Sequence, residues 1–253
     1  GRASMSDSIR PVEGFWGSIT STVDWCEENY EFTRFVAEFW NTLSSFAMVF
    51  AGAAGLLLHP YAELRFRLAF AGVVAVGIGS LAFHATLLFS MQAADEVPML
   101  WTVMCLVYCL LELDPIPRLG RWFPVALVAH AVITTAAVTL SHGSWQFILF
   151  HVSFGSAELC ALFTAFRLFM RCEDASLRPI FRRGFILYGL GIVCWFLDLQ
   201  CCTWLSQSIP TATGLPNPQL HAWWHALVSG GLYLISIGLL ATRSQRLGEK
   251  DAT

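Results

Sequence analysis

Seven apolar runs in this sequence constrain its fold more than any other feature. About 20 apolar residues form a helix that crosses the hydrocarbon core of a membrane, where no water can pair with a free backbone N–H or C=O group. Runs of that length must therefore be helical, and we place them at residues 35–58, 68–89, 97–113, 122–140, 145–170, 185–205 and 221–241. The expected fold class is an all-α polytopic membrane protein with seven transmembrane helices.

Composition agrees with this interpretation. Only 13% of the residues are charged and 56% are hydrophobic, whereas about 25% of the residues in a soluble domain are charged. The net charge of −3 decides nothing about partners, and nothing in the sequence suggests a nucleic-acid partner. Pro98 predicts a sharp start of the third helix, just after Asp95 and Glu96, because proline fits the first turn of a helix.

Basic residues predict the direction in which the helices cross. They follow the first, third, fifth and seventh runs, and the loops at 90–92, 141–144 and 206–219 contain no Lys or Arg. The positive-inside rule then puts the C-terminus in the cytosol and the N-terminus in the lumen or outside. The basic residues that follow these four runs are Arg65, Arg67, Arg118, Arg121, Arg171, Arg178, Arg182, Arg183, Arg243, Arg246 and Lys250.

Two histidines four residues apart, His221 and His225, share one face of the last helix. That spacing suits a zinc ion, and a catalytic zinc takes three protein ligands and keeps one position for water. His84, near the end of the second run, would be the third ligand. The alternative is that the histidines are packing or interfacial groups, because the neighbouring Trp223 and Trp224 also suit a membrane interface.

Other polar residues are expected at the same depth, where ionisable groups are costly and usually mark function. Asp95 is the candidate general base and acid, and Ser80, one turn before His84, is the candidate donor to the reacting oxygen. Asp198 is expected to orient a ligand histidine, and His151 to line the pocket. The set predicts an intramembrane zinc hydrolase.

An acidic segment precedes the first helix. Asp24, Glu27, Asn29 and Glu38, with a backbone carbonyl, are the kind of ligands that calcium takes. The alternative is an acidic cap at a helix N-terminus, which the helix dipole favours. The residues alone favour the cap.

Three cysteines are expected on the lumenal side, where disulfides form: Cys26, Cys201 and Cys202. Of the possible pairs we favour Cys26 with Cys202, which would tie the N-terminal segment to the end of the sixth run.

Glycines at 52, 55, 72, 77 and 79 permit close helix packing, either within or between chains.

Several motifs resemble those of the alkaline ceramidases, in order along nearly the whole chain. The acidic Asp-Trp-Cys-Glu motif is the most specific, and the overall form is closest to the phytoceramidase-like branch. The Ser-x-x-x-His, Asp and His-x-x-x-His set also resembles, more distantly, the progestin and adiponectin receptor-like proteins. The quoted stretches are 17–30, 37–42, 79–86, 92–98 and 221–225.

The resemblance implies a hydrolase of the endoplasmic reticulum or Golgi that cleaves ceramide, taken from the bilayer, into a sphingoid base and a fatty acid. It implies that three histidines bind catalytic zinc, that Ser80 and Asp95 assist catalysis, and that Trp224 lies at the site. It also implies a calcium site in place of the cap, and it agrees with a Cys26–Cys202 bridge. The implied zinc ligands are His84, His221 and His225, and the implied calcium ligands are Asp24, the carbonyl of Trp25, Glu27, Asn29 and Glu38.

The expected organisation has four parts. Residues 1–4, before Met5, look like a scar of expression, and residues 5–34 form a lumenal acidic segment. Residues 35–242 form the seven-helix catalytic domain, and residues 243–253 form a cytosolic tail. The alternative from another class is a seven-helix lipid receptor or lipid-binding protein with a structural zinc.

Overall fold

The computed structural model describes residues 14–251, so the expected scar at 1–4 lies outside the described residues. Seven of the described helices are long and apolar enough to cross a membrane, which confirms the expected fold class. A π-helical turn, η1 (Trp204–Ser208), and a short helix, α7 (Ile209–Thr213), precede the last of them. The seven are α1 (Phe39–Leu58), α2 (Leu64–Thr86), α3 (Phe89–Leu111), α4 (Phe123–Leu140), α5 (Gly143–Met170), α6 (Arg178–Gln200) and α8 (Leu220–Asp251).

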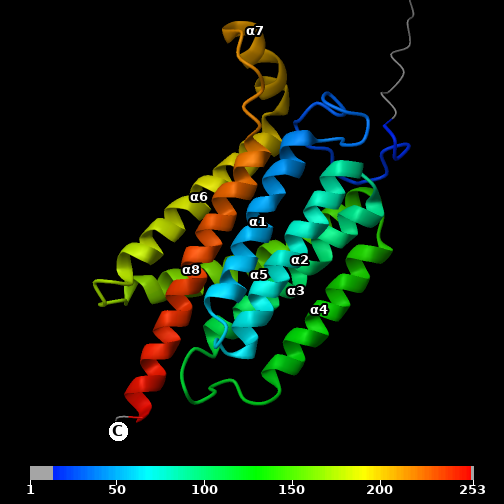
Figure 1. Cartoon of the computed structure of the whole chain (residues 1–253). Coiled ribbons are helices and arrows are strands. Elements are labelled where there is room, and N and C mark those ends of the chain that lie inside the picture. The colour runs from blue at the N-terminus through cyan, green and yellow to red at the C-terminus, as the bar shows by residue number, and fades with distance from the viewer. Residues whose placement is uncertain (1–13, 252–253) are drawn as a thin grey trace, which may run out of the picture.

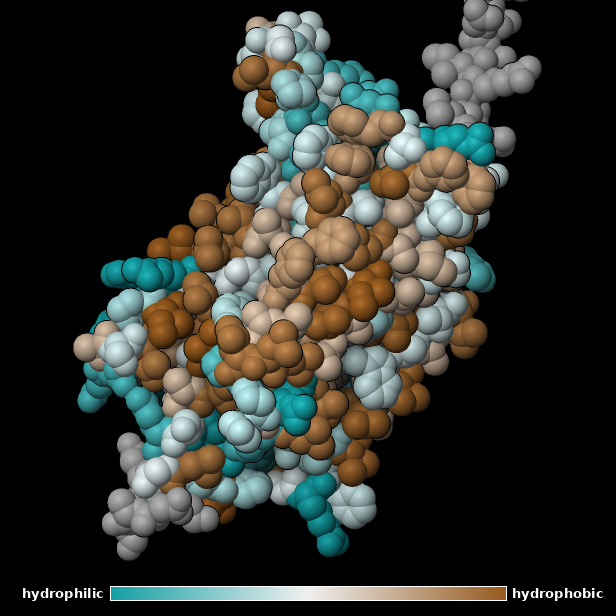
Figure 2. Space-filling view, in the orientation of Figure 1, coloured by the Kyte–Doolittle hydropathy of each residue, from teal (hydrophilic) through white to brown (hydrophobic). Residues whose placement is uncertain are grey.

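The long helices form one bundle (Figure 1). α2 packs between α1 and α3, and α8 packs between α1 and α6, whereas α4 and α5 pack against α3. On the face drawn in Figure 2, apolar residues cover the middle of the bundle and hydrophilic residues gather toward its two ends. We call the end where α1 and α8 begin and α2 ends the site end.

Glycines let the backbones of neighbouring helices approach closely. A Cβ atom on Gly79 of α2 would lie 2.1 Å from the carbonyl oxygen of Ala94 in α3. A Cβ atom on Gly231 of α8 would lie 2.7 Å from the backbone nitrogen of Tyr188 in α6. These glycines therefore pack helices of one chain together, and Gly79 brings its neighbour Ser80 beside the turn of α3 that carries Asp95.

The start of the third membrane helix differs from the prediction. α3 begins at Phe89 rather than near residue 97, and Pro98 lies in its interior. Leu87 ends α2 in the left-handed conformation, with φ 50°, and its side chain is fully buried. An apolar residue in that conformation gives no turn signal in the sequence, so the end of α2 could not be recognised. Proline is tolerated inside membrane helices, so Pro98 did not mark the start of α3.

Other boundaries also differ. α1 starts at Phe39, which leaves Glu38 just before the helix instead of inside it. α6 spans Arg178–Gln200 rather than 185–205, and the loop expected at 206–219 contains helical turns. α8 continues to Asp251, so most of the expected tail at 243–253 is an extension of the last helix. Polar residues such as Arg243 and Arg246 form ion pairs there, with Glu63 and Asp114, and a hydropathy pattern cannot detect such a helix.

Candidate metal centre and cavity

Three buried histidines meet at the site end of the bundle. His84 lies in the last turn of α2, and His221 and His225 lie in the first turns of α8. One ligand atom from each lies within 4.8 Å of those of the other two, and their side chains are 1%, 4% and 4% exposed. The predicted trio is therefore brought together, and three protein ligands are the number that a catalytic zinc with an open coordination position takes.

Hydrogen bonds fix two of the imidazole rings. Nδ1 of His84 lies 2.5 Å from Oε2 of Glu38, and Nδ1 of His225 lies 2.9 Å from Oγ of Ser44. These contacts leave Nε2 of each ring as the atom that faces the cluster. A metal-binding histidine commonly donates its other nitrogen to a carboxylate or similar group, so the surroundings of both rings fit a metal.

The third ring supports the same conclusion. His221 stacks under the indole of Trp25, with ring centroids 3.6 Å apart and planes at 21°. Its Nδ1 atom is buried without a hydrogen-bond partner among the described residues. An unpaired buried polar atom is costly, and a metal ion bound at this nitrogen would remove that cost.

The histidines open onto a cavity of about 380 Å³ that extends along the bundle as far as Leu239. Asp95, Ser80, Trp224 and His151 all line it, and of these His151 was expected to line a pocket. The two predicted catalytic residues differ in their partners. Oγ of Ser80 lies 2.8 Å from Oγ of Ser45, and Oδ1 of Asp95 is buried with no partner among residues 14–251.

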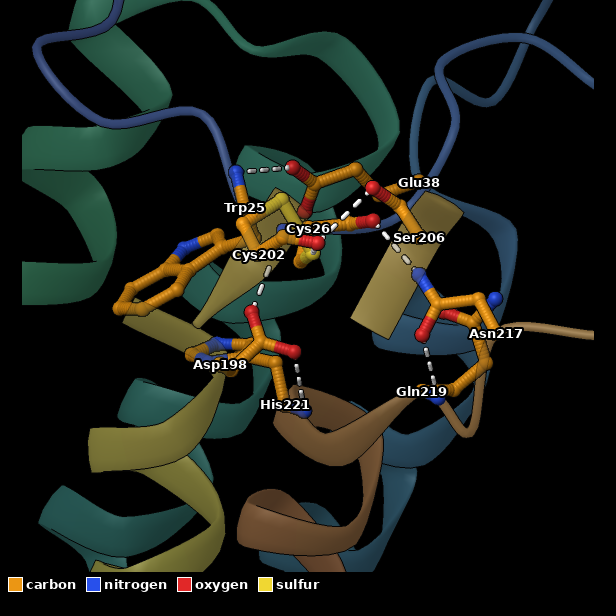
Figure 3. The surroundings of a disulfide bond; sticks show 9 residues. All are labelled: Trp25, Cys26, Glu38, Asp198, Cys202, Ser206, Asn217, Gln219 and His221. Atoms are coloured by element: carbon orange, nitrogen blue, oxygen red, sulfur yellow. Dashed lines mark hydrogen bonds between the residues drawn. A yellow bond between two sulfur atoms is a disulfide. The ribbon is translucent and has the colours of Figure 1, made fainter. Parts of the chain in front are cut away.

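Asp198, expected to orient a ligand histidine, contacts His221 through the backbone of that residue. Its Oδ1 accepts a hydrogen bond from the backbone N–H of His221 (3.2 Å), and its Oδ2 accepts one from the backbone N–H of Cys26 (3.1 Å). Figure 3 shows the carboxylate between these two segments. Asp198 therefore satisfies a free N–H group at the start of α8 and holds the N-terminal segment against that helix start.

Residues 20–26, which we call the strap, cross the site end of the bundle. The backbone N–H of Trp25 donates to Glu38 (2.9 Å), and Cys26 forms the expected disulfide with Cys202. Val23 and Trp25 of the strap line the cavity. The strap thus covers the cavity at the site end, and the disulfide attaches it beyond the end of α6 (Figure 3).

A buried polar network missed by the sequence reasoning also holds the strap. The two oxygens of Glu96 accept hydrogen bonds from the side-chain amides of Gln92 (2.7 Å) and Gln146. Thr22 of the strap donates its backbone N–H to Gln92 (2.7 Å) and its hydroxyl to Gln146 (2.5 Å). The four-residue spacing of Gln92 and Glu96 was visible in the sequence, but Gln146, on another helix, gave no signal.

The acidic segment caps α1, which is one of the two roles considered for it. The carboxylate of Glu27 accepts hydrogen bonds from the backbone N–H groups of Trp40 (2.6 Å) and Asn41 (2.9 Å), so it caps α1. The side-chain amide of Asn29 donates to both oxygens of Asp24 (2.9 and 3.2 Å). Oδ1 of Asn29 is buried and unpaired among the described residues.

Burial raises the pKa of three carboxyl groups in this segment. The pKa of Glu27 and that of Glu38 are both raised to about 7. Burial also raises the pKa of Asp24, and the nearby charge of Glu38 adds to the effect. Acidic groups that repel one another, together with an unpaired amide oxygen, fit a hard cation that takes oxygen ligands.

These features define a class of protein: a polytopic, seven-helix membrane protein with a buried three-histidine centre that opens into a cavity along its helices. The sequence profile of the Ceramidase family matches residues 17–253. The chain is 32% identical to alkaline ceramidase 3 of Mus musculus, over 92% of this chain and 87% of the relative. It is 30% identical to an alkaline ceramidase of Arabidopsis thaliana, over 96% and 91%. The chain belongs to the ceramidase family.

Proposed function

We propose that this protein hydrolyses the amide bond of ceramide, releasing a sphingoid base and a fatty acid. The observation that carries the proposal is that the three-histidine centre and Asp95, whose Oδ1 has no partner among the described residues, line one cavity that continues along the helices. The mouse and Arabidopsis relatives are named alkaline ceramidases. Incubation of the purified protein with ceramides, with both products quantified by mass spectrometry, tests the proposal. Equimolar release supports it, and no release from folded, metal-loaded protein favours a lipid receptor with a structural zinc.

The proposed cofactor is zinc, held by His84, His221 and His225. When bound, the ion lowers the pKa of a coordinated water and polarises the amide carbonyl. Asp95 then takes the proton of the attacking water and delivers it to the leaving amine nitrogen. The hydroxyl of Ser80 donates to the oxygen that gains negative charge, while the strap excludes bulk water and Trp224 and His151 contact the substrate.

The orienting role of Glu38 gives a testable prediction. Glu38→Gln replaces the carboxylate that faces Nδ1 of His84 (2.5 Å) with a weaker, neutral partner. Loss of such an orienting partner typically lowers metal affinity or activity by about 10–100-fold. We expect that loss in zinc affinity, measured by competition with a chromogenic chelator. An unchanged zinc affinity in the folded variant would contradict this role of Glu38.

We also propose that calcium binds the acidic segment through Asp24, the carbonyl of Trp25, Glu27, Asn29 and Glu38. The crowding of buried carboxyl groups and the unpaired oxygen of Asn29 support this site. Because Glu38 also contacts His84, the cation would steady the strap and α1 next to the zinc centre.

The raised pKa values predict how calcium binding depends on pH. Glu27 and Glu38, each with a pKa of about 7 without the cation, must ionise to bind calcium. Lowering the pH from 8 to 6 should therefore weaken binding about tenfold for each of these carboxyls. The stability of the calcium-free protein should depend on pH in the opposite direction. Because the folded state has the higher pKa values and holds more protons, the free energy of unfolding should fall as the pH rises toward 8. Calorimetry checks the first statement and thermal unfolding the second. A calcium affinity that does not depend on pH would contradict the prediction.

The remaining proposals concern location. We propose that the site end faces the lumen of the endoplasmic reticulum or Golgi and that residues 5–34 are the lumenal segment. Residues 35–242 form the catalytic domain. The C-terminal end of α8, within residues 243–253, is cytosolic. The basic residues after α1, α3 and α5 support this orientation. Ceramide would then reach the cavity from the surrounding bilayer.

A further inference from the structure

A second layer of polar side chains lines the cavity, away from the metal centre. Its members are Thr102 of α3, Glu158 of α5 and Tyr188 of α6. The mechanism above uses none of them. From this layer we infer a second binding subsite, which recognises a hydroxyl group in the middle of the substrate's acyl chain; the inference rests on the proposed function.

The two layers have the same spacing on three helices. On α3, Thr102 follows Asp95 by seven residues, and on α5, Glu158 follows His151 by seven. α6 runs in the opposite direction, and there Tyr188 precedes Trp195 by seven residues. Seven residues are about two turns, or about 10 Å of helix, and they return a side chain to nearly the same face. All six residues line the one cavity, so the second layer is about 10 Å deeper than the first.

Glu158 is the unusual member of this layer. It lies near the middle of α5, and its carboxylate accepts a hydrogen bond from the hydroxyl of Tyr188, which is 7% exposed. No salt bridge of the described part of the chain includes Glu158. An ionisable group at this depth is expensive and by default marks function, and one neutral partner leaves most of its hydrogen-bonding capacity unused.

Thr102 lines the cavity at the same depth, but its hydroxyl oxygen faces α2. That oxygen is buried without a partner among the described residues, and a Cβ atom on Gly72 would lie 2.2 Å from it, so it is closed to a ligand. The free hydrogen-bonding capacity of this layer therefore belongs to Glu158. A carboxyl group with one neutral partner leaves part of its desolvation uncompensated, and a hydroxyl group on the lipid that donates to Glu158 beside Tyr188 would compensate that cost.

Chain geometry predicts the position of this group on the substrate. The carbonyl carbon lies at the metal centre, so the acyl chain starts from the first layer. With C–C bonds of about 1.5 Å in an extended zigzag, a chain advances about 1.25 Å per carbon, and about 10 Å corresponds to about eight carbons. The preferred substrate therefore has its hydroxyl near carbon 9 or 10 of the acyl chain.

Matched ceramides test the subsite. We expect the purified protein to hydrolyse the 10-hydroxystearoyl amide with a kcat/KM about three- to tenfold above that of the stearoyl amide, as one added hydrogen bond gives. The 2-hydroxystearoyl amide should show no such preference. Tyr188→Phe and Glu158→Leu should each reduce the preference to about one, whereas Glu158→Gln, which keeps an acceptor, should retain part of it. Tyr233→Phe, on α8 outside this cavity, is the matched control and should keep the preference.

The outcomes separate recognition from a purely structural role. If the Glu158–Tyr188 contact only joins α5 to α6, Tyr188→Phe will lower both rates equally and leave the ratio unchanged, which overturns the inference. An absence of preference in the unmodified protein also overturns it. If no ceramide is hydrolysed, the proposed function fails, and thermal unfolding with 10-hydroxystearic acid against stearic acid still tests the subsite. A larger stabilisation by the hydroxy acid that disappears in Tyr188→Phe supports it, and equal stabilisation contradicts it.

Discussion

His221→Ala is expected to remove the bound metal and to lower ceramide hydrolysis by about a thousandfold or more. The ring is one of three buried imidazoles whose ligand atoms lie within 4.8 Å of one another. Two remaining histidines hold zinc weakly, and loss of the ion removes several kcal/mol of transition-state stabilisation. Metal content by mass spectrometry and fatty-acid release, measured on the same preparation, check both parts.

The control for this variant is His130→Ala. His130 is exposed on α4, outside the cavity, so its replacement should leave both metal content and turnover unchanged. The fold of each variant is checked by thermal unfolding, because His221→Ala also removes the ring on which Trp25 stacks. Full turnover by a folded His221→Ala protein would exclude the proposed zinc site.

Asp95→Asn should slow hydrolysis strongly without removing the metal. The residue lines the cavity with the histidines, and its Oδ1 has no partner among the described residues, so it is available for proton transfer. General acid–base catalysis typically contributes about 10²–10⁴-fold, and the isosteric amide cannot carry the proton. We therefore expect a fall in kcat of that size with zinc content unchanged.

Glu173→Gln is the matched control for the Asp95 variant. Glu173 is exposed in the loop between α5 and α6, at the opposite end of the bundle from the site. Its replacement should leave kcat unchanged. If Asp95→Asn loses zinc together with activity, Asp95 would be a ligand or a structural group rather than the proton carrier.

The fold class and the three histidines could be predicted because their signals are local. A membrane helix is recognised in a sequence by its length and apolar composition, and all seven membrane helices were expected. His221 and His225 share a face through helix periodicity alone. Their meeting with His84, more than a hundred residues away, was an additional hypothesis, and the structure bears it out.

Contacts between distant segments could not be predicted. Asp198 was expected to orient a ligand histidine, but nothing in its sequence neighbourhood indicated that its partners are the backbone N–H groups of His221 and Cys26. Thr22 pairs with Gln146 across 124 residues. Such pairings depend on how helices are arranged in space, which hydropathy and spacing do not encode.

The ends of the helices were also poorly predicted, because some of them depend on contacts with distant segments. Leu87 ends α2 although it is apolar, because the turn is buried and its carbonyl accepts hydrogen bonds from Thr20 and Ser21 of the strap. The end is therefore satisfied by a remote segment instead of a local capping residue. Glu38 shows the same dependence, since its contact with His84 becomes visible only when α1 and α2 are packed together.

Removal and restoration of the metal in one purified preparation tests most directly whether the three histidines support ceramide hydrolysis. A chelator should abolish fatty-acid release, and stoichiometric zinc should restore it, with one zinc per chain at full activity. His221→Ala treated in the same way should neither regain zinc nor release fatty acid. Undiminished release from protein that contains no metal would contradict the central claim.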